Sequence, residues 1–106
     1  MRKIQFGDAT LFTLTDARPP PADFRYAFAA HTADFDAPAR QIWAPDGLFH
    51  TRFAVHALVQ GGAVTLIDAG IGPEPSAYFN GLGGRLDAEL AQAGLDAAMV
   101  TRVVFT

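Results

Sequence analysis

Residues 52–68 read RFAVHALVQGGAVTLID, the clearest hairpin pattern in the chain. Side chains alternate along residues 53–59 with the period of two that a β-strand requires: Phe53, Val55, Ala57 and Val59 on one face, Ala54, His56 and Leu58 on the other. Gly61 and Gly62 supply the positive φ of a tight turn, and residues 63–68 return as a second strand. The stretch predicts a β-hairpin that ends at Asp68.

A first hairpin is predicted near the amino terminus. Residues 4–6 and 10–15 have strand character, with a Gly7-Asp8 turn between them. Phe12 and Leu14 fall on one face of the second strand, and residues 11, 13 and 15 fall on the other. The start of the chain carries positive charge but lacks the apolar segment of a secretory signal, so we expect a cytoplasmic protein.

After Asp68, two prolines keep residues 69–75 from being helical, and a helix is predicted to follow. Leu86, Leu90 and Ala93 recur at helical spacing, and Gly94 with Leu95 is typical of a Schellman ending.

Asp96 can cap a short turn over residues 97–100, and an apolar strand is predicted to begin near Arg102. The order of two strand pairs, a helix and a strand predicts an α+β or α/β fold in which the helix covers one face of a sheet. A sheet with one helix lacks cover on its other face. Because the chain stops within the apolar, β-branched run Val103–Thr106, we expect residues 1–106 to be a single partial domain, an amino-terminal fragment.

Composition excludes several classes of function. The chain has 106 residues, with 8 basic and 11 acidic side chains and a net charge of −3, so we expect neither a nucleic-acid nor a membrane partner. Zero cysteines exclude disulfides and thiolate metal ligands. A hydrophobic fraction of 50% indicates a globular core.

Residues 18–47 contain five prolines and little periodicity. Seven of the aromatic residues fall at positions 24–53: Phe24, Tyr26, Phe28, Phe35, Trp43, Phe49 and Phe53. Such a segment is either a pocket wall, a lid or a covered surface, or it packs beneath its own loop.

Asp68 is the first candidate site residue, because it ends an apolar strand where α/β proteins commonly place their chemistry. The alternative is that its carboxylate stabilises its own turn. Gly70 and Gly72 do not fit a dinucleotide-binding loop, since Pro75 stands where the third glycine belongs. Residues 68–72 also resemble, over a short stretch, the phosphate loop of actin-like sugar kinases.

The remaining candidates are weaker. If His50 and His56 shared one strand, they would lie about 20 Å apart, too far for two ligands of one zinc ion. His31 has no ligand pattern around it, and Ser76, the only serine, lacks the context of a nucleophile.

Two stretches, ALVQGGAVTLIDAGIG at residues 57–72 and GLDAAMVTRVVFT at residues 94–106, together resemble the amino-terminal part of the metallo-β-lactamase-fold metallohydrolases. In that family a hairpin ends in an Asp-x-Gly turn, a helix closes with a Gly-Leu-Asp-like phrase, and the next strand ends in threonine just before the metal motif His-x-His-x-Asp-His. The resemblance places Thr106 immediately before that motif. It implies a four-layer αββα sandwich in the longer protein, of which this fragment supplies the hairpins, one helix and the following strand.

The resemblance also implies an activity. The longer protein would bind one or two zinc ions and hydrolyse a small-molecule lactone, ester, thioester or related substrate through metal-activated hydroxide. Asp68 would support the metal-bearing loops without binding the metal, and residues 24–53 would line the substrate pocket or a homodimer surface. The fragment itself is expected to be inactive and to hold no zinc. Family members often have threonine where Ala69 stands.

Two alternatives remain open at this point. The chain could be a complete small β-rich interaction module with an aromatic binding loop, or a fragment of an actin-like sugar kinase.

Overall fold

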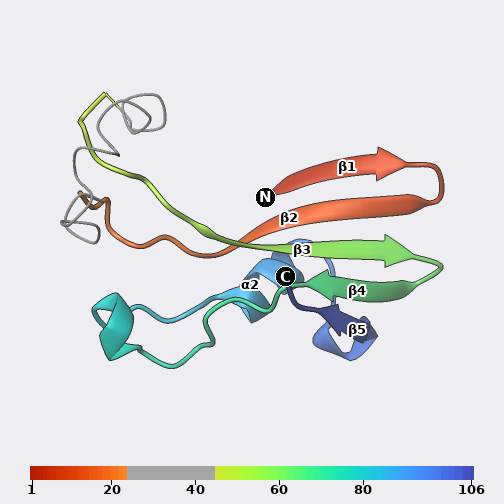
Figure 1. Cartoon of the computed structure of the whole chain (residues 1–106). Helices are drawn as coiled ribbons and strands as arrows, with labels where there is room; N and C mark the ends of the chain where they lie inside the picture. The colour runs from red at the N-terminus through yellow and green to blue at the C-terminus, as the bar shows by residue number, and fades with distance from the viewer. Residues whose placement is uncertain (24–44) are drawn as a thin grey trace. The chain divides into compact units, whose positions relative to one another are not determined.

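The computed structural model describes residues 1–23 and 45–106, which fall into two compact units. One unit comprises Met1–Arg18 and Arg52–Thr106, and the other comprises Pro19–Thr51. All the helices and strands of the described residues belong to the first unit (Figure 1). They are β1 (Arg2–Phe6), β2 (Ala9–Ala17), β3 (Phe53–Gln60), β4 (Ala63–Ile67), η2 (Ala77–Phe79), α2 (Leu86–Gln92), η3 (Ala97–Met99) and β5 (Val100–Val104).

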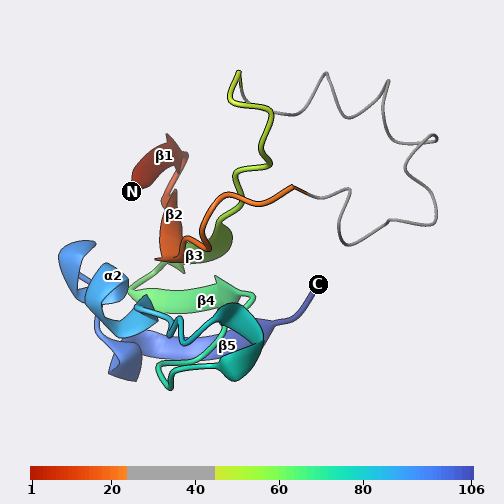
Figure 2. The same cartoon turned by 90° about the vertical axis from the view of Figure 1, so that its left-hand side faces the viewer.

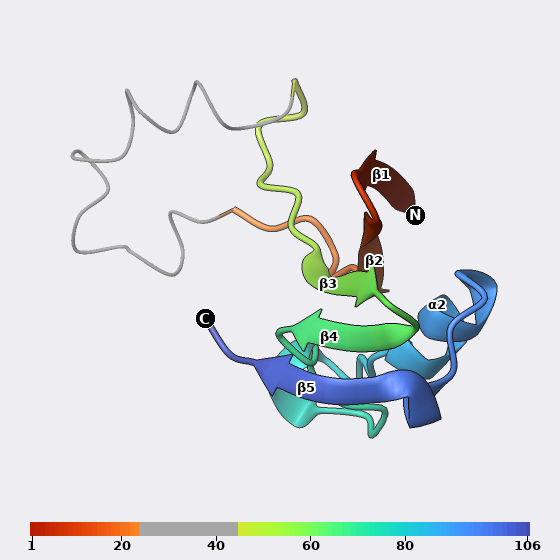
Figure 3. The ribbon, with the colours of Figure 1, turned by 90° about the vertical axis from the view of Figure 1, so that its right-hand side faces the viewer.

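The strands form one five-stranded sheet in the order β1-β2-β3-β4-β5. The first four strands pair antiparallel, and β5 lies parallel to β4 (Figures 1 and 3). Both predicted hairpins are confirmed, and Gly61 and Gly62 have φ values of 58° and 80° as their turn requires. One mixed sheet with one α-helix makes the fold α+β, which is the predicted fold class.

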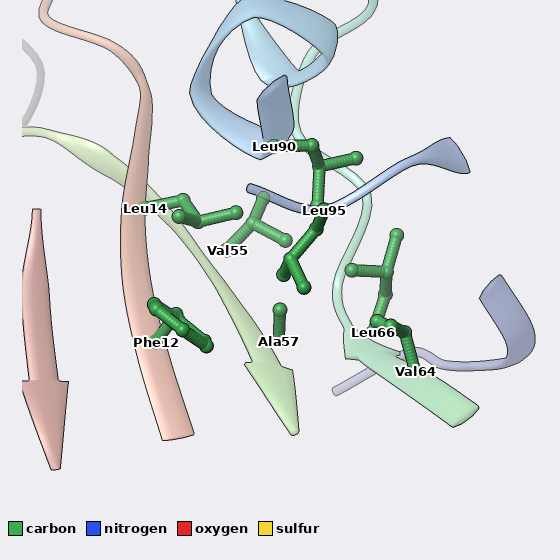
Figure 4. Packing of buried hydrophobic residues seen from close by; sticks show 8 residues of the cluster. All are labelled: Phe12, Leu14, Val55, Ala57, Val64, Leu66, Leu90 and Leu95. Atoms are coloured by element: carbon green, nitrogen blue, oxygen red, sulfur yellow. The ribbon is translucent and has the colours of Figure 1, made fainter. Parts of the chain in front are cut away.

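The core lies between one face of the sheet and α2. In β2 and β3 the buried positions include Phe12 with Leu14 and Val55 with Ala57, each pair sharing a face in the predicted alternation, and Leu14 and Val55 are fully enclosed. Fully burying a side chain of this size stabilises a fold by roughly 1.5–3 kcal/mol, so Leu14 and Val55 each contribute on that order. The cluster consists of Phe12, Leu14, Val55, Ala57, Val64, Leu66, Leu90 and Leu95 (Figure 4).

Helix α2 closes with the predicted Schellman motif. The N–H of Leu95 donates to the carbonyl of Leu90 at 2.9 Å, and the N–H of Gly94 donates to that of Ala91 at 3.0 Å. Gly94 has a φ of 74°, which a left-handed C-terminal residue needs. The turn brings Leu95 back beside Leu90 in the core, and α2 runs alongside the sheet (Figure 2).

The last strand begins earlier than predicted. Asp96 caps η3 as expected, accepting a hydrogen bond from the N–H of Ala98 at 2.8 Å. However, η3 ends at Met99 and β5 begins at Val100, which pairs with Val64, rather than near Arg102. The prediction placed the start too late because it relied on the apolar run that begins at Val103, whereas pairing with β4 starts three residues earlier, at Val100.

The second unit is described only at residues 19–23 and 45–51. Ala22 and Phe49 form an isolated antiparallel bridge, joined by backbone hydrogen bonds of 3.1 and 2.8 Å. Most of the predicted aromatic segment, from Phe24 to Trp43, lies outside the described residues, as does His31. In the described parts of both units, no helix has the length and apolar character needed to cross a membrane.

Candidate functional site

Asp68 directly follows β4 and is hydrogen-bonded to Thr106, which lies two positions beyond the end of β5. Its Oδ1 accepts a hydrogen bond from the N–H of Thr106 at 2.9 Å, and its Oδ2 accepts one from the Thr106 hydroxyl at 2.7 Å. The N–H of Asp68 donates to the carbonyl of Val104 at 2.7 Å. Because β4 and β5 are parallel, both strands finish at the same edge of the sheet, and Asp68 joins their ends.

The hydrogen bonds of the Asp68 carboxylate do not lie within its own turn, as the alternative role would require. Both carboxylate oxygens bond to Thr106, 38 residues away in the sequence. The N–H of Thr106, followed by its hydroxyl, lowers the pKa of the Asp68 carboxyl, and the charge of His56 adds a smaller effect in the same direction. The carboxylate is therefore ionised at neutral pH and acts as a hydrogen-bond acceptor only.

A second carboxylate, Asp16, organises the loop that starts at Asp68. Asp16 is only 1% exposed. Its Oδ2 accepts a hydrogen bond from the N–H of Ile71 at 2.8 Å, and its Oδ1 accepts one from the N–H of Arg85 at 2.9 Å. The register of β2 against β3 shifts between Thr15 and Ala17, so Asp16 is the additional residue of a β-bulge. It thereby links the loop after β4 to the start of α2.

Two glycines let the backbone approach this carboxylate. A Cβ on Gly84 would lie 2.5 Å from Asp16 Oδ1, and a Cβ on Gly70 would overlap the same carboxylate. Gly70 also has a φ of 72°, which L-residues with side chains rarely adopt. The absence of a side chain at Gly70 therefore lets its backbone pack directly against the Asp16 carboxylate.

Asp16 was missed in the sequence analysis, although the sequence carries a signal for it. Asp16 continues the spacing of Phe12 and Leu14, so the alternation places a carboxylate on the buried face of β2. Glu89 gives a similar signal, since it lies three residues after Leu86 and four before Ala93, on the apolar face of the helix. The structure leaves it only 9% exposed. A buried acid usually indicates a specific set of hydrogen-bond donors.

A surface hollow of about 380 Å³ lies beside this carboxylate, with Asp16, Gly72, Gly84 and Arg85 among its lining residues. The Asp16 oxygens there are already bonded to backbone N–H groups. Across residues 1–23 and 45–106, no group of three or more histidine, cysteine, aspartate or glutamate side chains could hold a metal ion.

Among the other described candidates, His56 lies in β3, opposite Thr13 on one side and Ile67 on the other. Ile67 directly precedes Asp68, and the charge of His56 slightly lowers the pKa of the Asp68 carboxyl. His50 belongs to the second unit, where its Nε2 lies 2.7 Å from Asp46 Oδ2. Ser76 precedes η2 and makes no side-chain capping bond. Among the described candidates, Asp68 is the residue whose hydrogen bonds join the ends of β4 and β5.

Comparisons with known proteins find a relationship at the level of structure. No protein-family model matches the sequence, and no curated protein matches it. The structure is similar to that of a probable metal-dependent hydrolase from Staphylococcus aureus, with a TM-score of 0.70 and 17% sequence identity. The match covers 97% of this chain and 39% of that protein. At this identity the likeness concerns the fold, and the chain spans well under half the length of the protein it matches.

Proposed function

We propose that these residues form the amino-terminal part of a zinc-dependent metallohydrolase of the metallo-β-lactamase fold. Its substrate would be a lactone, ester, thioester or related small molecule. The observation that carries the proposal is the likeness of 97% of the chain to one part of a probable metal-dependent hydrolase. The sequence phrases around Asp68 and Gly94 support the proposal separately, since they resemble phrases of the metallo-β-lactamase-fold family.

The described residues do not fit a metal site by themselves, because no three potential ligands lie together among them. The proposal therefore assigns the ligands to a His-x-His-x-Asp-His motif that follows Thr106 in a longer protein. Zinc bound there would lower the pKa of water and polarise the oxygen of the scissile group.

Asp68 has a definite part in this proposal. Its two bonds to Thr106 hold the residue that would immediately precede the motif. Removing a group that orients metal ligands from outside the coordination sphere typically lowers metal affinity or activity by 10–100-fold. In the longer protein, Asp68→Ala should lower zinc affinity within that range.

The test begins with the codons that follow position 106. The motif His-x-His-x-Asp-His in frame after Thr106 would support the proposal, and the longer protein should then contain one or two zinc ions by elemental analysis. It should hydrolyse members of a panel of lactones, esters and thioesters, and replacing the first two motif histidines with alanine should abolish both zinc content and turnover. A stop codon directly after codon 106 would overturn the proposal and favour the interaction module.

A further inference from the structure

The four residues from Asp68 to Ile71 are anchored at both ends. At one end, the N–H of Asp68 donates to Val104 at 2.7 Å and its carboxylate accepts from Thr106. At the other end, the N–H of Ile71 donates to Asp16 Oδ2 at 2.8 Å. Only Ala69 and Gly70 lie between the two anchors, so the segment has little freedom to change direction.

The hydrogen bond that holds Ile71 cannot shift unless the buried Asp16 side chain also moves. The Asp16 side chain is 1% exposed, and its other oxygen is bonded to the N–H of Arg85 at 2.9 Å. The backbones of Gly70 and Gly84 press against the carboxylate closely enough to exclude a Cβ at either position. The bulge in β2 sets the position of Asp16 itself.

The backbone of Asp68 needs such an anchor. Asp68 has a φ of 64°, one of two positive values among the described residues other than glycine. Left-handed backbone costs an L-residue roughly 1–2 kcal/mol, although aspartate tolerates it better than most. A conformation of this kind persists only where its surroundings enforce it. The Asp16–Ile71 bond is the enforcing contact on the carboxyl-terminal side of Asp68.

We propose that Asp16 is a positioning residue for Asp68. By fixing Ile71, it holds Asp68 in the left-handed conformation in which both carboxylate oxygens face Thr106. The two acids share no hydrogen bond with each other, and their coupling runs through the backbone of Ala69 and Gly70. This role goes beyond the proposed function and holds whether or not a longer protein binds zinc.

The test uses amide hydrogen exchange, measured by NMR on the complete 106-residue chain. Asp16→Asn keeps the size of the side chain but turns one acceptor oxygen into an NH₂ group that faces an N–H donor. We expect the amides of Ile71 and Thr106 both to exchange at least about tenfold faster, which corresponds to about 1.4 kcal/mol of lost protection. An unchanged Thr106 amide alongside a faster Ile71 amide would overturn the proposal.

The matched control is Asp96→Asn, which alters a carboxylate that also accepts a backbone N–H, at η3. This variant should leave the exchange rate of the Thr106 amide unchanged once the change in global stability is subtracted. If Asp16 only stabilised the fold as a whole, both variants would change that corrected rate equally.

If Asp16→Asn does not fold, native-state exchange of the unaltered chain in low denaturant decides the question. Ile71 and Thr106 should then open in one event, with equal free energies and equal denaturant dependence. A Thr106 amide that opens independently of Ile71 would contradict the coupling.

Discussion

The carboxylate of Glu89 in α2 accepts a hydrogen bond from the backbone N–H of Thr15 in β2, with 3.1 Å between Oε2 and N. β1 pairs with β2 only as far as Thr13, so Thr15 lies beyond the last strand pair on that side. The next residue, Asp16, is the bulge. The helix is therefore bonded to the sheet at the place where regular strand pairing stops, which fixes where α2 sits on the core.

The contact predicts different outcomes for two substitutions of Glu89. Glu89→Ala should lower the free energy of unfolding by about 1–3 kcal/mol, because a part-buried N–H loses its charged acceptor. Glu89→Gln keeps a carbonyl oxygen in reach and should lose less than half as much. Urea denaturation followed by circular dichroism measures both. Equal losses in the two variants would show that this hydrogen bond does not contribute to the free energy of unfolding.

Gly70 and Gly72 form a matched pair for testing the packing around Asp16. Both have positive φ, 72° and 82°, so alanine is strained by the backbone at either position. Only at Gly70 would the new Cβ also overlap Asp16, since the space around Gly72 is open within 4 Å.

Gly72→Ala should therefore cost roughly 1–2 kcal/mol, the backbone strain alone. Gly70→Ala should cost at least about 3 kcal/mol, because the overlap adds to that strain. The difference in denaturant midpoint between the two variants is the measurement, and similar midpoints would mean that Asp16 can move aside.

The local elements were predictable because each is decided by neighbouring residues. The glycine pair at 61–62 specifies a turn by its backbone freedom, and Gly94 with Leu95 specifies a helix ending. The helix position and the alternation of β2 and β3 followed from spacing alone.

The contacts of the site were not predictable in the same way, because they join distant parts of the chain. The partners of Asp16 lie 55 and 69 residues away, and that of Asp68 lies 38 residues away. No local sequence pattern identifies such partners, and the β-bulge at Asp16 depends on how β2 pairs with β3. The sequence could place Asp68 at a sheet edge, but only the pairing of β5 with β4 brings Thr106 to it.

The two edges of the sheet should differ in how readily they associate. Along β5, Val103 and Val104 are 42% and 43% exposed, and Phe105 beyond it is 76% exposed. No described strand pairs with the far side of β5. β1 is the other edge, but it begins with Arg2 and Lys3, and charged side chains disfavour pairing with another chain.

We therefore predict that the isolated chain is poorly stable and self-associates through β5. Val104→Lys should shift it toward monomer in sedimentation velocity experiments over a range of concentrations, whereas Ile4→Lys on β1 should have little effect. An unaltered chain that stays monomeric over the whole concentration range would contradict this prediction.

The hydrogen bonds between Asp68 and Thr106 should make the free energy of unfolding depend on pH in the acid range. The pKa of Asp68 is lowered in the folded protein, chiefly by the N–H and then the hydroxyl of Thr106. In the unfolded chain an aspartate titrates near its ordinary value of about 3.9. Above that value the carboxylate is ionised in both states and its stabilising contribution is complete. As the pH falls further, the unfolded chain takes up the proton first, so the contribution is lost by the time the pH has passed the lower folded pKa.

Asp68→Asn isolates this effect, because asparagine also tolerates the left-handed backbone that Asp68 adopts. The pKa of Asp46 is lowered as well, by the N–H of Leu48 and then by His50, but that group is present in both proteins and cancels in their difference. The difference in urea midpoint between the unaltered chain and the variant should be largest near neutral pH and should shrink as the pH falls below the ordinary aspartate value of about 3.9. A difference that stays constant from neutral pH down to pH 3 would mean that the charge on Asp68 adds nothing to its bonds with Thr106.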